Sequence, residues 1–381
     1  MRIGVPKEIK NNEFRVGLVP ASVRELVGHG HEVFVETTAG NGIGVADEEY
    51  VAVGAQILPD AASTFDTAEM IVKVKEPQAV ERAMLRPDHT LFTYLHLAPD
   101  APQTEDLVKS GATCIAYETV TDKRGHLPLL APMSEVAGRL SIQAGAWCLE
   151  KAHGGSGILL GGVPGVESAK VVVIGGGVVG FNAAQMVVGM GANVVVLDRN
   201  LDVLRFIDAT FDSRVQTVYS NAENIERHIQ DADLVIGGVL IPGAAAPKLV
   251  RREHLSTMRD GAVLVDVAID QGGCFETSRP TTHEEPTYVI DGVVHYCVAN
   301  MPGAVPRTST FALNNATLPF TLALADKGAK QAMLDDPHLL EGLNVHRGMV
   351  TYDDVARDLG YDYTPAVEAL AIAYGDLVWG L

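Results

Sequence analysis

Three glycines and an aspartate form the pattern in this sequence that most directly indicates chemistry. Gly175, Gly177 and Gly180 are spaced as Gly-x-Gly-x-x-Gly, and Asp198 follows where the next strand should end. Glycines at this spacing allow a sharp turn and a close backbone approach to a pyrophosphate, which the following helix N-terminus binds. A carboxylate at Asp198 accepts hydrogen bonds from a ribose diol and repels a 2′-phosphate, so the pattern predicts NAD rather than NADP. Arg199 could partner a phosphate, which leaves the strictness of this preference open.

A lysine and a histidine lie near the ends of two further apolar runs. The run MIVKVKEP at 70–77 alternates in polarity, so we expect a strand with Lys73 and Lys75 on one face. The run HTLFTYLHLAP at 89–99 contains His96 near its end. Open α/β sheets bind ligands at the carboxyl ends of their strands, so Lys75 and His96 are placed for chemistry. Taken alone, each residue also has an ordinary structural interpretation: Lys75 could be a solvated lysine at a sheet edge, and His96 could be a hydrogen-bonded structural histidine.

The glycine pattern lies within a βαβ unit at 170–198, where two β-branched runs flank a helical segment. Further apolar runs at 231–240, 261–270 and 293–302 are expected to be strands of the same sheet. Their carboxyl ends should line the cofactor crevice together with the glycine turn. Asp270 is the one ionisable residue at those ends, and a turn or N-cap aspartate explains it equally well.

The order of these elements predicts an α/β fold with two Rossmann-like, doubly wound domains. A βαβ rhythm also runs through the first part of the chain, where a strand at 1–5 opens into a loop that carries Arg15. A helical pattern from Ser134, a plausible N-cap, to residue 153 is long enough to bridge two domains. The segments after residue 302 look helical and should return to the first domain. We therefore predict a discontinuous substrate domain (1–133 with 307–381), an NAD-binding domain (134–306) and an active-site cleft between them, with long helices as the connection.

Composition limits the partners and the location. The chain has 381 residues, of which 47% are hydrophobic, enough for two packed cores. Its formal net charge of −19, without basic runs, argues against nucleic acid and anionic membranes as partners. The N-terminus lacks an apolar signal-like stretch, and no run approaches the length of a membrane span. Four scattered cysteines fit a reducing compartment, so we expect a cytoplasmic protein without a metal site.

Several long segments carry a resemblance that runs nearly from end to end. They are RIGVPKEIKNNEFRVGLVP, VKVKEP, TYLHLA, LLAPMSEVAGRL, GGVPGV, VVVIGGGVVGFNAA, LVDVAIDQGGCFE and CVANMPGAVPRTST. In these segments the chain resembles the alanine dehydrogenase family, which includes the NAD-binding subunit of proton-pumping transhydrogenase. The resemblance implies reversible, NAD-dependent oxidative deamination of L-alanine to pyruvate and ammonium, a reaction of amino-acid catabolism. It also implies a homohexamer, and it assigns no role to the tail after about residue 340.

The resemblance also implies a role for each of four residues. Arg15 would bind the substrate carboxylate, and Lys75 would hydrogen-bond the substrate and polarise its C2 oxygen. His96 and Asp270 would be the catalytic acid–base residues, with Asp270 beside the nicotinamide. Oxidation of an amino acid requires proton removal and stabilisation of positive charge, which these side chains can provide.

The resemblance further implies contacts with the cofactor from the strand ends and from the helix that opens the second domain. Besides the three glycines, these residues are Ser134, Val178, Val179, Asp198, Ser220, Val239, Leu240, Val267, Ala268, Ile269, Asp270, Arg279, Val298, Ala299, Asn300 and Met301.

Three other functions are compatible with this fold. One is a transhydrogenase subunit that binds NAD without a small acid substrate, and another is a related opine-type or lysine-pathway dehydrogenase. The third is an inactive NAD-binding regulator. The joint presence of Arg15, Lys75 and His96 argues against the first, and their combination with Asp270 argues against the third.

Overall fold

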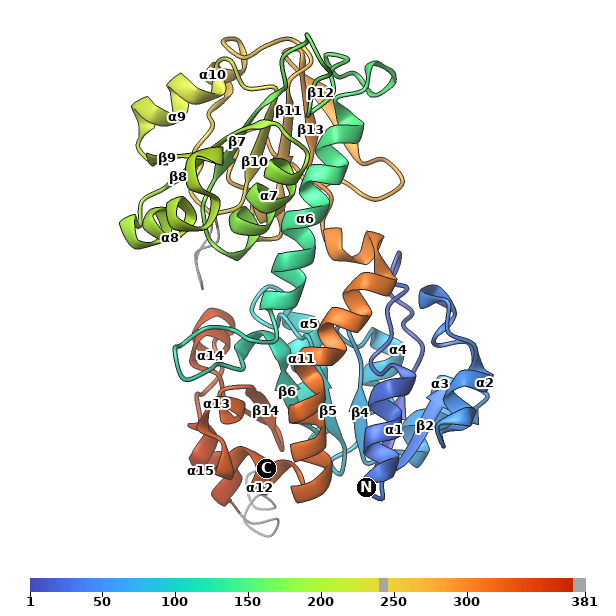
Figure 1. Cartoon of the computed structure of the whole chain (residues 1–381). Helices are drawn as coiled ribbons and strands as arrows, with labels where there is room; N and C mark the ends of the chain where they lie inside the picture. The colour runs from blue at the N-terminus through green and yellow to red at the C-terminus, as the bar shows by residue number, and fades with distance from the viewer. Residues whose placement is uncertain (240–245, 373–381) are drawn as a thin grey trace. The chain divides into compact units, whose positions relative to one another are not determined.

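The computed structural model describes residues 1–239 and 246–372, and the chain divides into two compact units (Figure 1). Unit 1 consists of Met1–Met133 and Val305–Leu381, and unit 2 consists of Ser134–Ala304. Unit 2 therefore corresponds to the segment predicted to bind NAD, with its end at Ala304 rather than at residue 306.

Unit 1 is built on an eight-stranded sheet with the order β15-β14-β6-β5-β4-β1-β2-β3. Its strands β1 to β6 are parallel and follow the doubly wound order 3-2-1-4-5-6. Strand β14 is antiparallel to both β6 and β15. The bounds are β1 (Arg2–Val5), β2 (Glu32–Glu36), β3 (Gln56–Leu58), β4 (Met70–Val72), β5 (Thr90–Thr93), β6 (Thr113–Ala116), β14 (Leu343–His346) and β15 (Met349–Val350).

Helices cover both faces of this sheet. Apolar residues of α3 (Ala61–Thr67), α5 (Ala101–Ser110) and α14 (Asp353–Leu359) share a core cluster with residues of β4, β5 and β6. On the other face, α1 (Pro20–Gly28) packs against α11 (Pro306–Lys327), as Figure 1 shows. The remaining helices are η1 (Asn41–Ile43), α2 (Asp47–Ala52), α4 (Ala79–Arg82), η2 (Tyr117–Thr119), α12 (Ala329–Asp335), α13 (Pro337–Leu340) and α15 (Ala366–Ala371).

Strand β4 is shorter than the alternating run predicted. It ends at Val72, so the prediction of a strand with Lys73 and Lys75 on one face is wrong. The carboxylate of Glu8 accepts a hydrogen bond from the Val74 N–H at 2.7 Å, so a side chain replaces a neighbouring strand as the partner of this backbone group. Lys73 consequently lies in the interior, fully buried.

The segment after residue 302 contains more than helices. Strands β14 and β15 return to unit 1, where Leu343 pairs with Ile115 and so extends the sheet beyond β6. The helices expected there are present, with α11 longer than predicted and the second one divided into α12 and α13. The return of this segment to unit 1 makes the unit discontinuous.

Unit 2 is built on a seven-stranded sheet with the order β12-β13-β11-β10-β7-β8-β9. Apart from the antiparallel edge strand β12, its strands are parallel in the same 3-2-1-4-5-6 order. The prediction of two Rossmann-like, doubly wound sheets is thus confirmed. The bounds are β7 (Lys170–Ile174), β8 (Asn193–Asp198), β9 (Val215–Tyr219), β10 (Leu234–Gly237), β11 (Val263–Asp266), β12 (Thr287–Ile290) and β13 (Val293–Tyr296).

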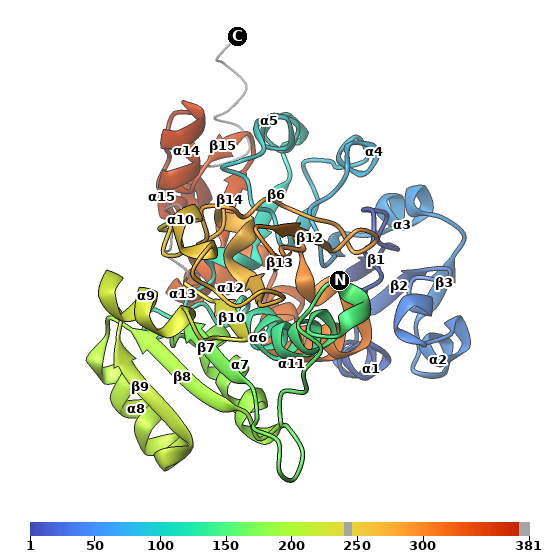
Figure 2. The same cartoon turned by 90° about the horizontal axis from the view of Figure 1, so that it is seen from above.

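Helices α7 (Val178–Gly189) and α8 (Leu201–Phe211) cover one face of this sheet. Helices α9 (Ala222–Ile229) and α10 (Arg252–Leu255) cover the other face, and Figure 2 shows the two sets on opposite sides of the strands. Short 3-10 turns complete the unit: η3 (Lys151–His153), η4 (Asp212–Arg214), η5 (Val267–Gln271) and η6 (Met301–Ala304).

The boundary between the units falls within α6 (Ala131–Cys148). Ser134 therefore lies inside the first turn, and the prediction that it is the N-cap is wrong. The helix begins earlier because the carbonyl of Leu127 already accepts hydrogen bonds from the N–H groups of Leu130 and Ala131. In the part of the chain that the structure describes, no helix is both long and apolar enough to cross a membrane.

Candidate active site

Unit 2 gathers most of the predicted cofactor residues along the carboxyl edge of its parallel strands. Gly237 at the end of β10 is level with Ile174 of β7 and with Asp266 of β11, so the segments that follow these strands are neighbours. Leu240 lies outside the described residues. The others at this edge are Gly175, Gly177, Val178, Val179, Gly180, Asp198, Ser220, Val239, Val267, Ala268, Ile269, Asp270, Val298, Ala299, Asn300 and Met301.

The glycine turn after β7 has the geometry that a bound pyrophosphate requires. Gly175 has a φ of +98°, which favours glycine. A Cβ on Gly180 would lie 1.7 Å from the carbonyl oxygen of Gly175, so α7 can pack against the turn only with glycine there. Gly177 precedes α7 without a side-chain cap, and a Cβ there would meet no atom within 4 Å. The helix N-terminus is thus accessible to an anion, and the turn fits a dinucleotide.

The carboxylate of Asp198 is held next to this turn. Its Oδ2 accepts a hydrogen bond from the Gly176 N–H and its Oδ1 accepts one from the Asn200 N–H, each at 2.7 Å. The Ser220 N–H donates to the Asp198 carbonyl at 2.9 Å. This partly buried carboxylate is therefore fixed where the sequence places the ribose partner.

Two predicted cofactor residues lie away from the strand ends. Ser134 precedes Gly138 by one turn of α6, and a Cβ on Gly138 would lie 2.2 Å from the carbonyl of Val179, so this part of α6 packs on the start of α7. The exposed Arg279 stacks its guanidinium over the Tyr288 ring at 4.1 Å.

Asp270 lies in η5, a turn that the side chain of Asp266 stabilises by hydrogen bonds. Asp270 is exposed, whereas Asp266 at the end of β11 is buried. Burial raises the pKa of Asp266 despite five donors around its carboxylate. These donors are Ala268 N at 3.1 Å, Cys274 N at 3.3 Å, Cys274 Sγ at 3.6 Å, Phe275 N at 3.3 Å and Ser278 Oγ at 2.5 Å. The buried carboxylate thereby shapes the turn that presents Asp270.

In unit 1, the predicted carboxylate-binding Arg15 is already engaged by a buried carboxylate. Its Nε and Nη2 donate to the two oxygens of Glu13 at 2.7 and 2.6 Å, and its Nη1 donates to the Met133 sulfur at 3.1 Å. Arg15 is 2% exposed and Glu13 is 5% exposed. Burial raises the pKa of Glu13, but the hydrogen bonds and charge of Arg15 outweigh burial and lower it. The guanidinium is therefore fixed in orientation before any substrate binds.

His96 lies beyond the end of β5 in a strained conformation. Its φ of +50° is in the left-handed region, which non-glycine residues seldom adopt and which recurs at functional sites. Strand β5 stops at Thr93 because the Glu118 carboxylate accepts the N–H groups of Leu95 at 3.2 Å and His96 at 2.5 Å. The His96 ring is exposed and stacks on Tyr94 at 5.8 Å, with Nδ1 3.9 Å from Glu118.

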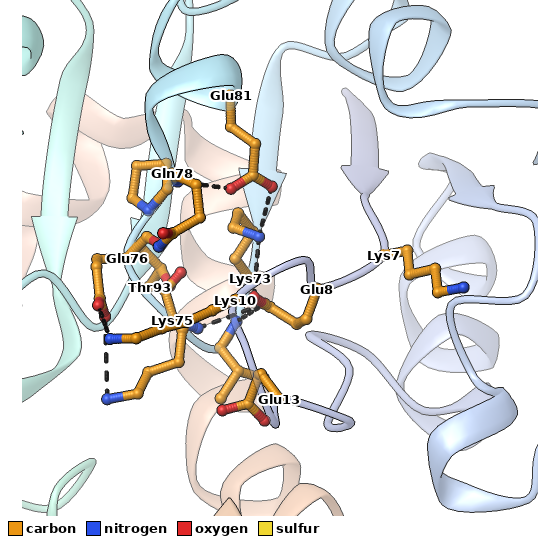
Figure 3. Close-up of polar contacts among 12 residues, drawn as sticks. Lys7, Glu8, Lys10, Glu13, Lys73, Lys75, Glu76, Gln78, Glu81 and Thr93 are labelled. Carbon is orange, nitrogen blue, oxygen red and sulfur yellow. Dashed lines mark hydrogen bonds and ion pairs between the residues drawn. The ribbon is translucent and has the colours of Figure 1, made fainter. Parts of the chain in front are cut away.

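Lys75 lies among acidic partners in the segment after β4, as Figure 3 shows. Its Nζ is 3.9 Å from Oε2 of Glu76, whose other oxygen, Oε1, accepts a hydrogen bond from Lys10. Burial raises the pKa of Glu76, and the charges of Lys75 and Lys10 outweigh burial and lower it. The Lys75 side chain is 14% exposed, so it is not a solvated lysine at a sheet edge.

The segments that carry Lys75 and His96 run side by side, because the Tyr94 N–H donates a hydrogen bond to the Val74 carbonyl at 3.2 Å. The charge of Lys75 contributes to the lowered pKa of Glu13, the partner of Arg15. Tyr94, whose ring stacks on His96, interacts electrostatically with Arg15. The structure thus brings together three candidates that are far apart in the sequence.

Sequence reasoning missed the carboxylates that hold these candidates, namely Glu8, Glu13 and Glu118. Glu13 had a usable signal, because it stands two residues before Arg15 in the same loop. Glu8 and Glu118 contact segments distant in the chain, so no local pattern identifies them. Within residues 1–239 and 246–372, no group of three or more His, Cys, Asp or Glu side chains could hold a metal ion.

Comparisons with known proteins find relatives over nearly the whole chain. The family models "Alanine dehydrogenase/PNT, N-terminal domain" and "Alanine dehydrogenase/PNT, C-terminal domain" match residues 4–137 and 141–353. An alanine dehydrogenase of Halomonas elongata is 60% identical over 97% of this chain and all of its own length. A solved L-alanine dehydrogenase is 54% identical, with a TM-score of 0.92 over 94% of this chain and 99% of its own. A transhydrogenase structure from Sinorhizobium meliloti is 25% identical, with a TM-score of 0.79 over 93% of this chain and 99% of its own.

Proposed function

The chain belongs to the alanine dehydrogenase/PNT family, and on that premise we propose that it catalyses the reversible oxidative deamination of L-alanine to pyruvate and ammonium. The observation that carries the proposal is the group formed by Arg15, Lys75 and His96 in unit 1. An amino-acid substrate needs a cation for its carboxylate and titratable groups for its nitrogen and for water.

In this proposal Arg15 binds the substrate carboxylate, and Glu13 orients the guanidinium through its hydrogen bonds with Nε and Nη2. Lys75 donates a hydrogen bond to the substrate and polarises the C2 oxygen of pyruvate. His96 removes or delivers a proton at the substrate nitrogen and at the attacking water. Its side chain is 45% exposed, so the ring is accessible from solvent.

Asp270 is the residue of unit 2 that we propose as a catalytic acid–base group. Its carboxylate would stabilise the positive charge that develops on the substrate nitrogen during oxidation. The turn built by Asp266 supports this role, because it presents an exposed carboxylate next to the predicted nicotinamide residues of the same strand end.

We propose NAD as the cofactor, which accepts the hydride of the substrate Cα when it is bound. The turn at Gly175–Gly180 would hold the pyrophosphate, and Asp198 would accept hydrogen bonds from the adenine ribose. The fixed orientation of the Asp198 carboxylate supports NAD, since a 2′-phosphate would meet a negative charge.

The competing functions have weaker support. The transhydrogenase structure shares 25% of its residues with this chain, against 60% for the Halomonas alanine dehydrogenase. An opine-type or lysine-pathway dehydrogenase keeps the same chemistry with a larger substrate. We further propose a cytoplasmic location and a homohexamer, as the cysteine content and the family resemblance predicted.

A panel of amino acids with NAD and with NADP tests the proposal. We expect NADH formation with L-alanine at alkaline pH, detected by the absorbance of the reduced nicotinamide, and much lower rates with NADP. Turnover of lysine but not of alanine would replace the substrate assignment. Hydride exchange between nicotinamides without any amino acid would favour the transhydrogenase function.

A further inference from the structure

Beneath Lys75 lies a charged cluster that the proposed reaction does not use. Lys73 forms ion pairs with Glu8 at 3.0 Å and with Glu81 at 2.8 Å, as Figure 3 shows. The side chains of Lys73, Glu8 and Glu81 are 0%, 2% and 1% exposed. A buried triad of this kind is not needed for stability, because well-packed apolar residues usually stabilise a core equally well. The hydrogen bonds that Glu8 of this triad accepts from the backbone indicate a role beyond stability.

The cluster contains two carboxylates and one ammonium group, and their charges shift each other's pKa values. Two carboxylates surround one ammonium, so both keep Lys73 charged and its pKa is raised although burial alone would lower it. Burial raises the pKa of Glu8, and Lys73 opposes this shift. The ammonium thus holds the Glu8 carboxylate in one orientation.

The orientation of Glu8 determines the backbone that carries Lys75. Oε2 of Glu8 accepts the hydrogen bond from Lys73 Nζ, while Oε1 accepts hydrogen bonds from the N–H groups of Val74 at 2.7 Å and Lys75 at 3.4 Å. On the other side, the Lys75 carbonyl accepts a hydrogen bond from the Thr93 hydroxyl at 3.0 Å. The Lys75 residue is therefore fixed at both its N–H and its carbonyl.

From these contacts we propose that Glu8 is a positioning residue for the reaction, which acts by fixing the backbone of the substrate-binding Lys75. Lys73 holds the Glu8 carboxylate in the orientation that this task needs. Glu81 has a different place, because its second oxygen accepts the Gln78 N–H at 2.7 Å at the start of α4 and no described contact joins it to Lys75. The inference rests on the proposed function, since Lys75 must bind the substrate for its position to matter.

The test compares Glu8→Gln with Glu81→Gln in the full-length protein. Each substitution removes one buried ion pair with Lys73, so both should lower the melting temperature. The glutamine side chain in Glu8→Gln has one acceptor oxygen and one NH2 donor group. The NH2 group must therefore face either the Lys73 ammonium or the backbone N–H groups, where the wild type has an acceptor. We expect its kcat/KM for L-alanine to fall by about tenfold to a hundredfold, as for other small misplacements of a binding group, with an unchanged Kd for NADH. The fall in Glu81→Gln should be distinctly smaller.

Two further variants complete the design. Glu8→Asp keeps the charge but shortens the side chain by one methylene, so the carboxylate can pair with Lys73 or with the backbone but not with both. We expect a lower kcat/KM for this variant. It keeps the proposal testable if Glu8→Gln does not fold. Asp233→Asn is the control, because Asp233 is also buried, pairs with Arg259 and accepts the Lys170 N–H, but lies at the amino end of β10. Its kcat/KM should equal that of the wild type.

Two results would overturn the positioning role. One is a Glu8→Gln or Glu8→Asp variant that has a lower melting temperature but the same kcat/KM as the wild type, which would make Glu8 purely structural. The other is an equal loss of kcat/KM in Glu8→Gln and Glu81→Gln, which would remove the backbone contact as the cause. Failure of the wild type itself to oxidise alanine would instead refute the proposed function, so the two failures are distinguishable.

Discussion

The pair of Arg15 and Glu13 allows the structural and catalytic contributions of one residue to be separated. Arg15→Ala would leave the Glu13 carboxylate buried without the guanidinium donors at 2.7 and 2.6 Å. Glu13→Ala would leave the guanidinium buried without its counter-ion. Breaking a buried ion pair on one side typically costs about 3–5 kcal/mol, so each single variant should lose stability of this order.

The double variant Glu13→Ala/Arg15→Ala removes both charges and should recover part of that loss. Because no uncompensated charge remains, the loss in the double variant should be smaller than the sum of the two single losses by about 0.5–3 kcal/mol. Activity should follow a different pattern. If Arg15 binds the substrate carboxylate with charge-assisted hydrogen bonds, Arg15→Ala and the double variant should both lose about a hundredfold or more in kcat/KM for L-alanine.

Urea unfolding gives the stability of each variant, and initial rates of NADH formation give kcat/KM. Arg357→Ala is the matched control, since Arg357 pairs with Asp354 and Asp358 on the exposed surface of unit 1 and should change neither quantity much. A double variant with near-wild-type kcat/KM would show that Arg15 is not the carboxylate ligand. Strictly additive losses of stability would refute the coupling of the buried pair.

Two other predictions concern protons. His96→Ala and Asp270→Asn should each abolish most turnover while the Kd for NADH, measured by fluorescence titration, stays near wild type; a near-normal rate in either variant would remove that residue from the mechanism. Burial lowers the pKa of His346 from 6.5 to about 4, so the native protein keeps it neutral where the unfolded chain already binds a proton. Its contribution to stability is full above pH 6.5 and is lost as the pH falls toward 4, by up to ~3 kcal/mol. Urea unfolding at pH 7 and pH 4.5 should show this loss, and His346→Gln, which does not titrate, should lose correspondingly less stability than the wild type between the two pH values.

The elements around the glycine turn could be predicted because their signals are local. The β-branched run before Gly175 and the run that ends at Asp198 coincide with β7 and β8. The run predicted at 261–270 proved longer than β11, because its last residues leave the sheet and form η5, and β10 ends at Gly237, within the run predicted at 231–240. A pattern of apolar residues indicates burial, not hydrogen bonding to a neighbouring strand. Buried residues just beyond the end of a strand therefore look like a continuation of that strand.

The supports of the candidate residues could not be predicted for a related reason. Glu8 contacts Val74 and Lys73, which are more than sixty positions away, and Glu118 reaches His96 from a neighbouring strand end. In each case a carboxylate accepts backbone N–H groups where a strand stops. A sequence shows where a carboxylate occurs. Only the folded sheet determines which backbone N–H group donates a hydrogen bond to it.

The repeated strand order suggests how the two units would bind the different anions that we propose for them. In both sheets the chain begins with an inner strand, the third from one edge, β1 in unit 1 and β7 in unit 2, and the segment after this strand lies at the carboxyl edge. After β7 that segment is the Gly175–Gly180 turn, which offers backbone N–H groups and a helix N-terminus to a phosphate that can be approached closely. After β1 it is a longer loop that carries Glu13 and Arg15, and it offers a guanidinium instead. A small carboxylate presents two oxygens in one plane, which a fixed guanidinium matches better than a turn of N–H groups does. The same position in one fold can therefore hold the cofactor through the backbone and the proposed substrate through a side chain, provided that a carboxylate such as Glu13 fixes that side chain in advance.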